Sequence, residues 1–568
     1  MKKTFNKIVG MVLSAIAVFG MFGCKRGLVE IPNADTDGKR IEIKATIAGF
    51  GVDWLADIVE KFNEVYADEG YVAVVTQQDT VVNAINELVT PKECTTDIYF
   101  QYADLINVAL NKSRAILKSE KALLADITDA LNSPAIGTDK KEHGDKLIDR
   151  IVGNLADSVK YTGKLKGYNG LYGIPWQGGT TGVYINKNVL AKFGYTLDNI
   201  LTTDDFIDVI RKMAPEPTEE NLTNNSLMFP VSWSGKIAPG YWQYLFDALL
   251  CQYEGLESYN NFYGFIPDEG DVVSNGYSVY EKKGILVSLK VLDALLDKDL
   301  AAPGTTSRDH IQMQAAVATG KAFMCVTGDW IYKELEADYS SKMSNVIAIK
   351  TPVISALGVK LGLCGKTHNT DDNCAACNEK LRNIVKAVDA GTDSDAKIAS
   401  DVGGGATEEK VARIREARGY YEGGYYSTVA MIPAFSDAVK GAKLFLRFMY
   451  SDECMKLYRA KTYVDLPARY IEEPEKDSRD FVQAIYDRVF GGNGTPFTYY
   501  NLSPIRRVAG VRNFPNEGST GAVVNGLTYS HSHASKGQYS PAEIYQNNIT
   551  FVKASWGDYL REAGLDAE

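Results

Sequence analysis

The chain has 568 residues, of which 23% are charged and 45% hydrophobic, with 50 glycines and 18 prolines. This composition excludes a disordered chain, a collagen-like repeat and a polytopic membrane protein. The 72 acidic and 61 basic side chains give a formal net charge of -11. Because no excess of positive charge exists to neutralise phosphates, this balance argues against a nucleic-acid partner.

The N-terminus has the pattern of a lipoprotein signal peptide. Basic residues precede an uncharged stretch, residues 8–23, which is too short to span a membrane comfortably. The stretch ends in Gly23-Cys24, which resembles the lipobox in which the cysteine is lipidated and becomes the mature N-terminus. We expect a signal peptide over residues 1–23, a lipid on Cys24 and a polar tether over 24–40. This predicts anchoring at the outer face of the cytoplasmic membrane; a secretory signal with a chance cysteine is the alternative.

The first segment after the tether alternates strands and helices. Residues 41–47 and 71–76 have strand patterns, as does a short run at 97–100, and helical patterns cover 53–66 and 81–89. This alternation is typical of a parallel α/β sheet, which binds ligands beyond the carboxyl ends of its strands. Residues 48–54 and 100–104 lie at two such ends.

The remaining chain continues with mixed patterns. Residues 167–187 contain two short β-like runs punctuated by glycines, and 323–326 is a strand leading into Gly328-Asp329-Trp330. Residues 360–424 are polar, cysteine-bearing and glycine-rich, and they are interpreted as an insertion before β character resumes at 429–433. Helices are predicted over 204–213, 241–251, 283–296, 310–320, 438–450 and 453–461.

Five blocks in this order resemble extracellular solute-binding protein family 1, the maltose-binding-like receptors of sugar ABC transporters. The opening strand–helix–strand carries Phe62-Asn63-Glu64, and the next block joins residues 171–176 (LYGIPW) to 184–188 (YINKN). The other blocks are residues 202–206 (TTDDF), 320–324 (GKAFM) with 328–330 (GDW), and 432–448 followed by 451–453 and 466–467.

The resemblance implies an α/β, type II periplasmic-binding-protein-like fold with two lobes, crossing strands and a ligand cleft between the lobes. Mapped block by block, the first lobe holds residues 41–178 and 428–475, and the second holds 179–427 and 476–568. The implied function is capture of a carbohydrate, favoured to be an oligosaccharide, by a monomer that delivers it to an ABC permease. Ligand binding with lobe closure, and no covalent chemistry, is the implied mechanism.

Aromatic side chains are the candidate ligand contacts, because sugar rings offer flat C–H faces surrounded by hydroxyls. The strongest candidate is Trp330, which the family match places in the cleft wall of the second lobe, only partly packed, with Asp329 beside it for a hydroxyl. Trp556 lies in a C-terminal amphipathic pattern and is assigned to packing. The other candidates are Phe50, Trp54, Trp176, Gln177, Trp233, Tyr241 and Trp242.

Two other classes of function stay open from the residues alone. The five histidines fit no nucleophile or zinc-hydrolase motif, yet carboxylates are plentiful enough for a glycosidase pair. A surface-anchored glycan-degrading enzyme is therefore one alternative. A receptor for a non-sugar solute, such as a peptide or a polyamine, is the other.

One cluster lies outside the family blocks. Cys364, His368, Cys374 and Cys377 fall within fourteen residues with zinc-like spacing. A disulfide or plain reduced thiols are the competing interpretations. Removal of Cys24 from the eight cysteines leaves seven, so not all of them can pair internally. A structural zinc is thus the single cofactor that the sequence suggests.

Overall fold

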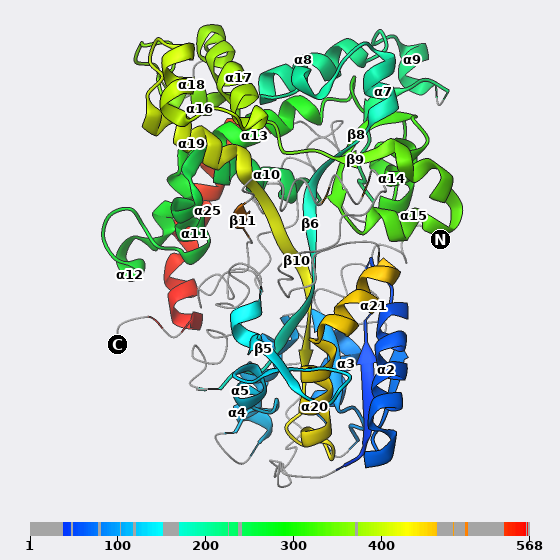
Figure 1. The fold of residues 1–568 in the computed structure, drawn as a ribbon. Coiled ribbons are helices and arrows are strands. Elements are labelled where there is room, and N and C mark those ends of the chain that lie inside the picture. The colour runs from blue at the N-terminus through cyan, green and yellow to red at the C-terminus, as the bar shows by residue number, and fades with distance from the viewer. Residues whose placement is uncertain are drawn as a thin grey trace, which may run out of the picture.

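The computed structural model describes much of the chain in separate stretches. These are residues 38–46, 49–77, 81–91, 93–102, 104–117, 121–151, 168, 170–224, 226–236, 241–369, 373–462, 481, 485, 495–497, 539–563 and 565. Cys24, the signal peptide and most of the predicted tether lie outside them. Figure 1 shows two groups of elements, drawn below and above, that two long strands connect.

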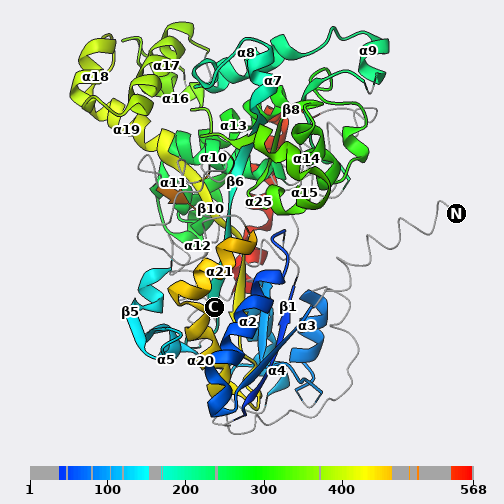
Figure 2. The ribbon, with the colours of Figure 1, turned by 45° about the vertical axis from the view of Figure 1, so that its right-hand side comes forward.

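The first group is built on the predicted parallel start. The strands β1, β2 and β3 pair in parallel, with β1 in the middle, which confirms the βαβαβ prediction. Along β3, Ile98 and Phe100 enter the main hydrophobic core, whereas Tyr99 between them enters a second core. Because successive side chains of a strand point to opposite faces, both faces of this sheet are buried. Figure 2 shows α2 on one side of β1 and α3 on the other. Elements of this group are β1 (Arg40–Ala45), α2 (Asp53–Tyr66), β2 (Val72–Gln77), α3 (Val81–Leu88), β3 (Ile98–Tyr102), α4 (Asp104–Ile116), α5 (Thr128–Leu131), β4 (Pro134–Ile136), β5 (Glu142–Lys146), α20 (Val439–Met449) and α21 (Asp452–Thr462).

Two antiparallel strands, β6 (Ile174–Asn186) and β10 (Tyr420–Met431), run between the groups. At its first end β6 pairs with β10, which itself pairs with β3; at its other end β6 pairs with β8 (Ala322–Gly328). Within the described residues this produces one sheet of nine strands, with the main order β2-β1-β3-β10-β6-β8-β7. The prediction of two short β-like runs over 167–187 was wrong, because Gly178, Gly179 and Gly182 lie inside one continuous strand.

The second group surrounds the far end of the sheet. Elements of this group are α7 (Lys187–Lys192), α8 (Thr203–Met213), α9 (Glu219–Thr223), β7 (Phe229–Val231), α10 (Trp242–Glu254), α11 (Leu256–Gly264), α12 (Val272–Asn275), α13 (Lys283–Leu295), α14 (His310–Ala318), β8, α15 (Ile331–Tyr339), β9 (Val346–Ala348), α16 (Ser355–Lys360), α17 (Ala375–Ala390), α18 (Asp395–Val402), α19 (Glu408–Gly419) and α25 (Pro541–Ala563). The short strand β11 (Thr495–Phe497) pairs with β10. In the described part of the chain, no helix is both long and apolar enough to cross a membrane.

The polar segment 360–424 is mostly helical, which the sequence analysis did not predict. It contains α17, α18 and α19, and the crossing strand β10 begins inside it, at Tyr420 and not at 429. On α17 the buried residues Cys377, Leu381, Ile384 and Val385 recur at helical spacing among charged neighbours. A narrow apolar stripe of this kind suffices for a helix that lies on the surface of the group.

Candidate functional site

The site begins where β8 ends and α15 starts, at Gly328-Asp329-Trp330. Asp329 is fully buried and joins this turn to the crossing strand. Its Oδ2 accepts hydrogen bonds from the backbone N–H (2.9 Å) and the hydroxyl (3.1 Å) of Thr180, and its own N–H donates to the carbonyl of Thr180. Asp329 is predicted to take a ligand hydroxyl; in this structure its carboxylate binds Thr180 of β6.

Trp330 packs against the backbone at two glycines, where any larger residue would collide with it. A Cβ on Gly328 would stand 2.2 Å from the indole ring, and one on Gly49 would stand 2.6 Å from the Trp330 side chain. Only glycine permits this approach. With 4% of its surface exposed, Trp330 is more buried than the sequence analysis predicted.

Three aromatic rings meet Trp330 edge to face, and they come from both groups of elements. Phe50 follows β1 in the first group, and its ring centroid lies 6.3 Å from that of Trp330. Tyr241 and Tyr244 from the start of α10 lie at 6.1 Å and 6.0 Å. Tyr244 was missed by the sequence analysis, since helical position alone did not distinguish it from core residues. We call these four residues the Trp330 cluster.

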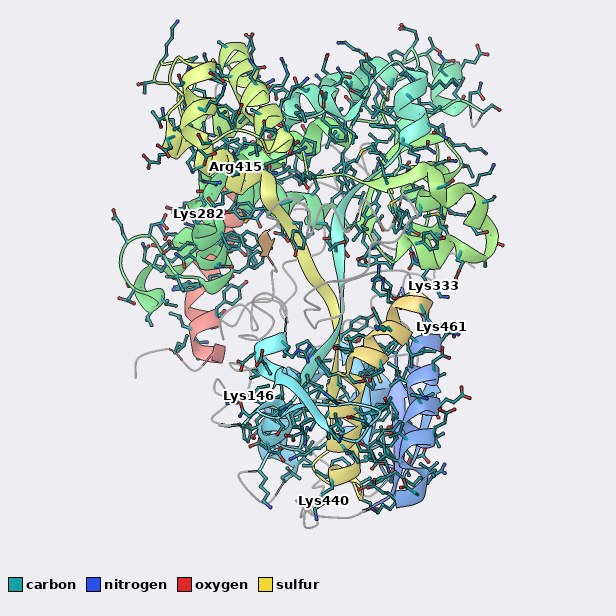
Figure 3. The ribbon with its side chains drawn as sticks, viewed as in Figure 1. Lys146, Lys282, Lys333, Arg415, Lys440 and Lys461 are labelled. Carbon is teal, nitrogen blue, oxygen red and sulfur yellow. The ribbon has the colours of Figure 1, made fainter. Side chains whose placement is uncertain are left out.

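The two groups also meet beside this cluster through an ion pair. Lys333 on α15 places its Nζ 3.9 Å from Oδ2 of Asp53, the first residue of α2. In Figure 3, Lys333 lies between the two groups. The Asp53 side chain is 67% exposed, so this pair contributes little to stability. At this point the two groups thus meet through the ring edge of Phe50, the close approach of Gly49 to Trp330 and one weak ion pair.

Trp54 and Trp176 form a separate stack in the first group. Their rings are parallel to within 26° with centroids 5.4 Å apart, and both side chains are buried. Tyr458 packs edge-on against both rings, and Tyr450 packs against Trp176. A ligand could contact either tryptophan only after these neighbours moved.

The other candidates are distributed around the second group. Trp233 and Trp242 are buried, at 3% and 1% exposure, and neither has a described ring contact with Trp330. Gln177 pairs with Thr428 through the backbones of β6 and β10. Trp556 packs on Phe265, as its assignment to packing predicted. Among the predicted contacts whose side chains the structure describes, Phe50, Asp329, Trp330 and Tyr241 therefore lie together.

Three polar side chains, Gln314, His310 and Glu334, form a group that adjoins the Trp330 cluster through His310. Glu334 on α15 accepts a hydrogen bond of 2.8 Å from Gln314 Nε2, and its other oxygen lies 3.6 Å from His310 Nε2. His310 in turn meets the ring of Tyr241. Burial raises the pKa of the Glu334 carboxyl to about 7, against the opposing hydrogen bond from Gln314, and burial also lowers the pKa of His310. No pattern in the sequence indicates that this carboxyl is buried.

Glu334→Gln is expected to remove part of the pH dependence of stability. Because the folded-state pKa of about 7 exceeds the ordinary 4.5, the folded chain binds more protons than the unfolded chain between these values. The free energy of unfolding should therefore fall by about 3 kcal/mol as the pH rises through this window. Glutamine cannot ionise and keeps the oxygen that accepts from Gln314. Urea unfolding at several pH values measures the difference, with Glu60→Gln on the exposed face of α2 as the control. Equal pH slopes in wild type and Glu334→Gln would contradict the assignment.

The four predicted metal ligands lie close to one another, in a part of the sequence that follows the residues of the Trp330 cluster. Cys364, His368, Cys374 and Cys377 place their donor atoms within 4.8 Å of one another, in the loop between α16 and α17 and the first turn of α17. They form the one such group of His, Cys, Asp and Glu within the stretches that the structure describes.

Comparison with known proteins then decides the family. A model of the family described as bacterial extracellular solute-binding protein matches residues 101–456. The chain belongs to this family. This confirms the resemblance found in the sequence. No curated protein matches this solute-binding protein in sequence.

Solved structures agree on the fold of this solute-binding protein. A probable secreted solute-binding lipoprotein from Streptomyces coelicolor gives a TM-score of 0.54 at 13% identity, over 91% of this chain and 100% of that one. A structure from work on xylan utilization by Caldanaerobius polysaccharolyticus gives 0.53 at 13% identity, over 90% and 100%. RafE in complex with raffinose gives 0.51 at 12% identity, over 90% and 99%. The periplasmic-binding-protein-like α/β fold predicted from the sequence is thereby confirmed.

Proposed function

We propose that this solute-binding protein captures a carbohydrate, an oligosaccharide, between its two groups of elements and delivers it to an ABC permease. The observation that carries the proposal is the Trp330 cluster, in which an indole from one group meets Phe50 from the other. Aromatic faces of this kind stack on sugar rings. Proteins of the same fold include the raffinose complex of RafE and a chitin oligosaccharide binding protein.

In this proposal the two groups act as lobes, with residues 41–178 and 428–475 in the first and 179–427 and 476–568 in the second. Lobe separation there breaks the contact between Phe50 and Trp330 and the approach of Gly49 to the indole. The edge-to-face ring contact is worth about 0.5–1.5 kcal/mol beyond the area that it buries. Separation exposes the indole, and a ligand that contacts both lobes then favours closure through its higher affinity for the closed state. The permease recognises that state, and the ligand undergoes no covalent change.

A thermal-shift screen tests the class of ligand. Purified protein is mixed with neutral mono- and oligosaccharides, peptides and polyamines, and the melting temperature is measured. We expect a rise with at least one oligosaccharide, because a ligand bound only to the folded state stabilises it. A rise in melting temperature with peptides or polyamines alone would show that the ligand belongs to that class and is not a carbohydrate. Release of new reducing ends from purified glycans would instead indicate a glycan-degrading enzyme.

We also propose that Cys24 anchors the protein to the outer face of the cytoplasmic membrane. The support is the uncharged stretch that ends in Gly23-Cys24. Cys24→Ser is expected to leave an unlipidated precursor of higher mass and to move the protein out of the membrane fraction. Immunoblots of membrane and soluble fractions measure this, with Cys94→Ser as the control. A Cys24→Ser protein that is still processed and membrane-bound would contradict the anchor.

A further inference from the structure

The cysteine cluster between α16 and α17 has the geometry of a tetrahedral metal site. Sγ of Cys364 lies 2.9 Å from Nε2 of His368 and 3.9 Å from Sγ of Cys374. All four donor atoms, including Sγ of Cys377, lie within 4.8 Å of one another. Donors bound to Zn²⁺ at about 2.0–2.3 Å stand about 3.5–3.8 Å apart, so small side-chain adjustments bring the four onto one ion.

The start of α17 holds two of these ligands in place. Cys374 is the N-cap of the helix, and Cys377 lies in its first turn. The backbone N–H of Cys377 donates to Sγ of Cys374 over 3.3 Å. This hydrogen bond holds the sulfur of Cys374 over the first turn of the helix, beside Cys377.

The turn after α16 positions Cys364. Gly362 and Gly365 have φ values of +60° and +82°, a left-handed conformation that favours glycine, and they stand close to Cys364 on either side. The N–H of Gly365 donates to the carbonyl of Gly362, and Gly405 donates to Leu363 from the next loop. The backbone around Cys364 is therefore fixed before any metal arrives.

We propose that Cys364, His368, Cys374 and Cys377 bind one zinc ion with a structural role. Three thiolates and one imidazole complete a four-coordinate site and leave no open position for substrate, which is typical of structural zinc. A disulfide between Cys364 and Cys374 would use only two of the four donors. It would give no role to His368 or to the buried Cys377.

The ion would tie α17 to the turn after α16, and α17 then supports the rest of the second group. Arg382 on α17 donates from Nε to Asp205 of α8 over 2.8 Å, and Asn378 donates to the same carboxylate over 3.3 Å. At the other end of the helix, Asp389 pairs with Arg418 before β10. Loss of the ion is thus expected to destabilise this helical segment without touching the Trp330 cluster.

Elemental analysis tests the site directly. The protein is purified without a histidine tag, reduced, loaded with zinc and desalted. We expect about one equivalent of zinc in the wild type and in the control Cys94→Ser, whose cysteine lies outside the cluster. We expect less than about a tenth of an equivalent in Cys364→Ser and in His368→Ala. Both positions are partly exposed, so these substitutions should fold.

Two further measurements separate metal from disulfide. Cobalt loading should produce the absorption bands of a tetrahedral thiolate complex, and chelation should lower the melting temperature of the wild type but not of Cys364→Ser. Less than about a tenth of an equivalent of zinc in the loaded wild type would overturn the proposal. So would a peptide map of the unreduced protein that shows Cys364 linked to Cys374. Neither result would affect carbohydrate binding, which is measured separately.

Discussion

Trp330→Ala is expected to lower the affinity for the carbohydrate ligand by roughly ten- to a hundred-fold, because it removes a stacking face and its buried area. Since Trp330 is only 4% exposed, the substitution should also cost about 3–5 kcal/mol in the free energy of unfolding. The sequence analysis predicted a smaller cost, because a residue of the cleft wall was expected to be partly packed. The contacts with Phe50, Tyr241 and Tyr244 account for the difference.

The loss of affinity and the loss of stability can be separated with matched variants. Trp330→Phe keeps an aromatic face and should retain more affinity than Trp330→Ala. Trp556→Phe makes the same change at a buried tryptophan that packs on Phe265 and donates to Val273, away from the cluster. Calorimetric titration of folded protein gives the affinity, and urea unfolding gives the stability. Unchanged affinity in Trp330→Ala, together with a large loss of stability, would make Trp330 a core residue only.

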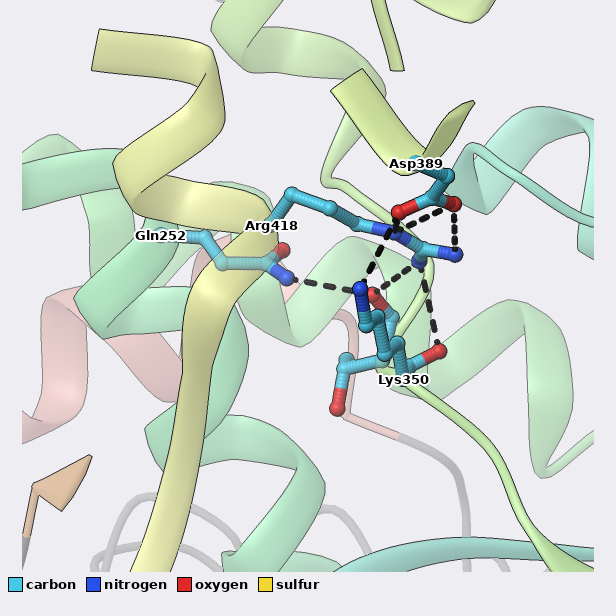
Figure 4. Close-up of polar contacts among 5 residues, drawn as sticks. Gln252, Lys350, Asp389 and Arg418 are labelled. Carbon is cyan, nitrogen blue, oxygen red and sulfur yellow. Dashed lines mark hydrogen bonds and ion pairs between the residues drawn. The ribbon is translucent and has the colours of Figure 1, made fainter. Parts of the chain in front are cut away.

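Arg418→Ala is expected to destabilise the second group by about 2–4 kcal/mol. Figure 4 shows the guanidinium between Asp389 and the turn at Lys350. Arg418 Nη2 lies 2.8 Å from Asp389 Oδ2, and Nη1 donates to the carbonyl of Thr351 over 3.0 Å. The Arg418 side chain is 9% exposed, so its removal leaves a partly buried carboxylate and a buried carbonyl without these donors.

The pH dependence of this variant follows from Asp389. Burial alone would raise the pKa of the Asp389 carboxyl, but Arg418 and Lys350 outweigh it, so that the pKa is lowered from 3.8. A lowered pKa contributes stability above the ordinary value, and this contribution is lost as the pH falls below about 4. The difference between wild type and Arg418→Ala should therefore shrink in acid.

Urea unfolding near neutral pH and near pH 3.5 measures both effects. Arg415→Ala is the control, because Arg415 belongs to the same helix and pairs with Asp395 in a more exposed position. We expect less than about 1 kcal/mol of destabilisation from the control. A difference of less than about 0.5 kcal/mol between Arg418→Ala and wild type would contradict the assigned role of the pair.

The first group was predictable because its signals are local. Apolar residues such as Leu55, Ile58 and Phe62 recur at helical spacing on α2. The strand β1 alternates apolar and polar residues, and β3 begins with an apolar run over 98–100. The glycines of β6 misled the sequence analysis, because glycine usually interrupts a strand. Here Gly179 is required by a contact that is far away in sequence, since a Cβ there would stand 2.7 Å from Asp329.

The site was predictable only in part, because its contacts join residues that lie far apart in the sequence. The position of Trp330 after a strand followed from the family block, whereas its burial depends on Phe50, which lies far away in the chain. The carboxyl of Glu334 is buried by packing between α14 and α15, and a single helix pattern does not contain that information. The cluster of Cys364, His368, Cys374 and Cys377 was predictable because these residues lie within fourteen positions of the sequence.

Calorimetric titration with carbohydrates, followed by analysis of the ligand afterwards, tests the central claim most directly. Purified protein is titrated with the oligosaccharides that raise its melting temperature, and the mixture is then separated by chromatography. The proposal predicts saturable binding at one site per chain, at least ten-fold weaker binding by Trp330→Ala, and complete recovery of unchanged ligand. Absence of binding to every carbohydrate in the panel, or recovery of shortened glycans, would contradict it.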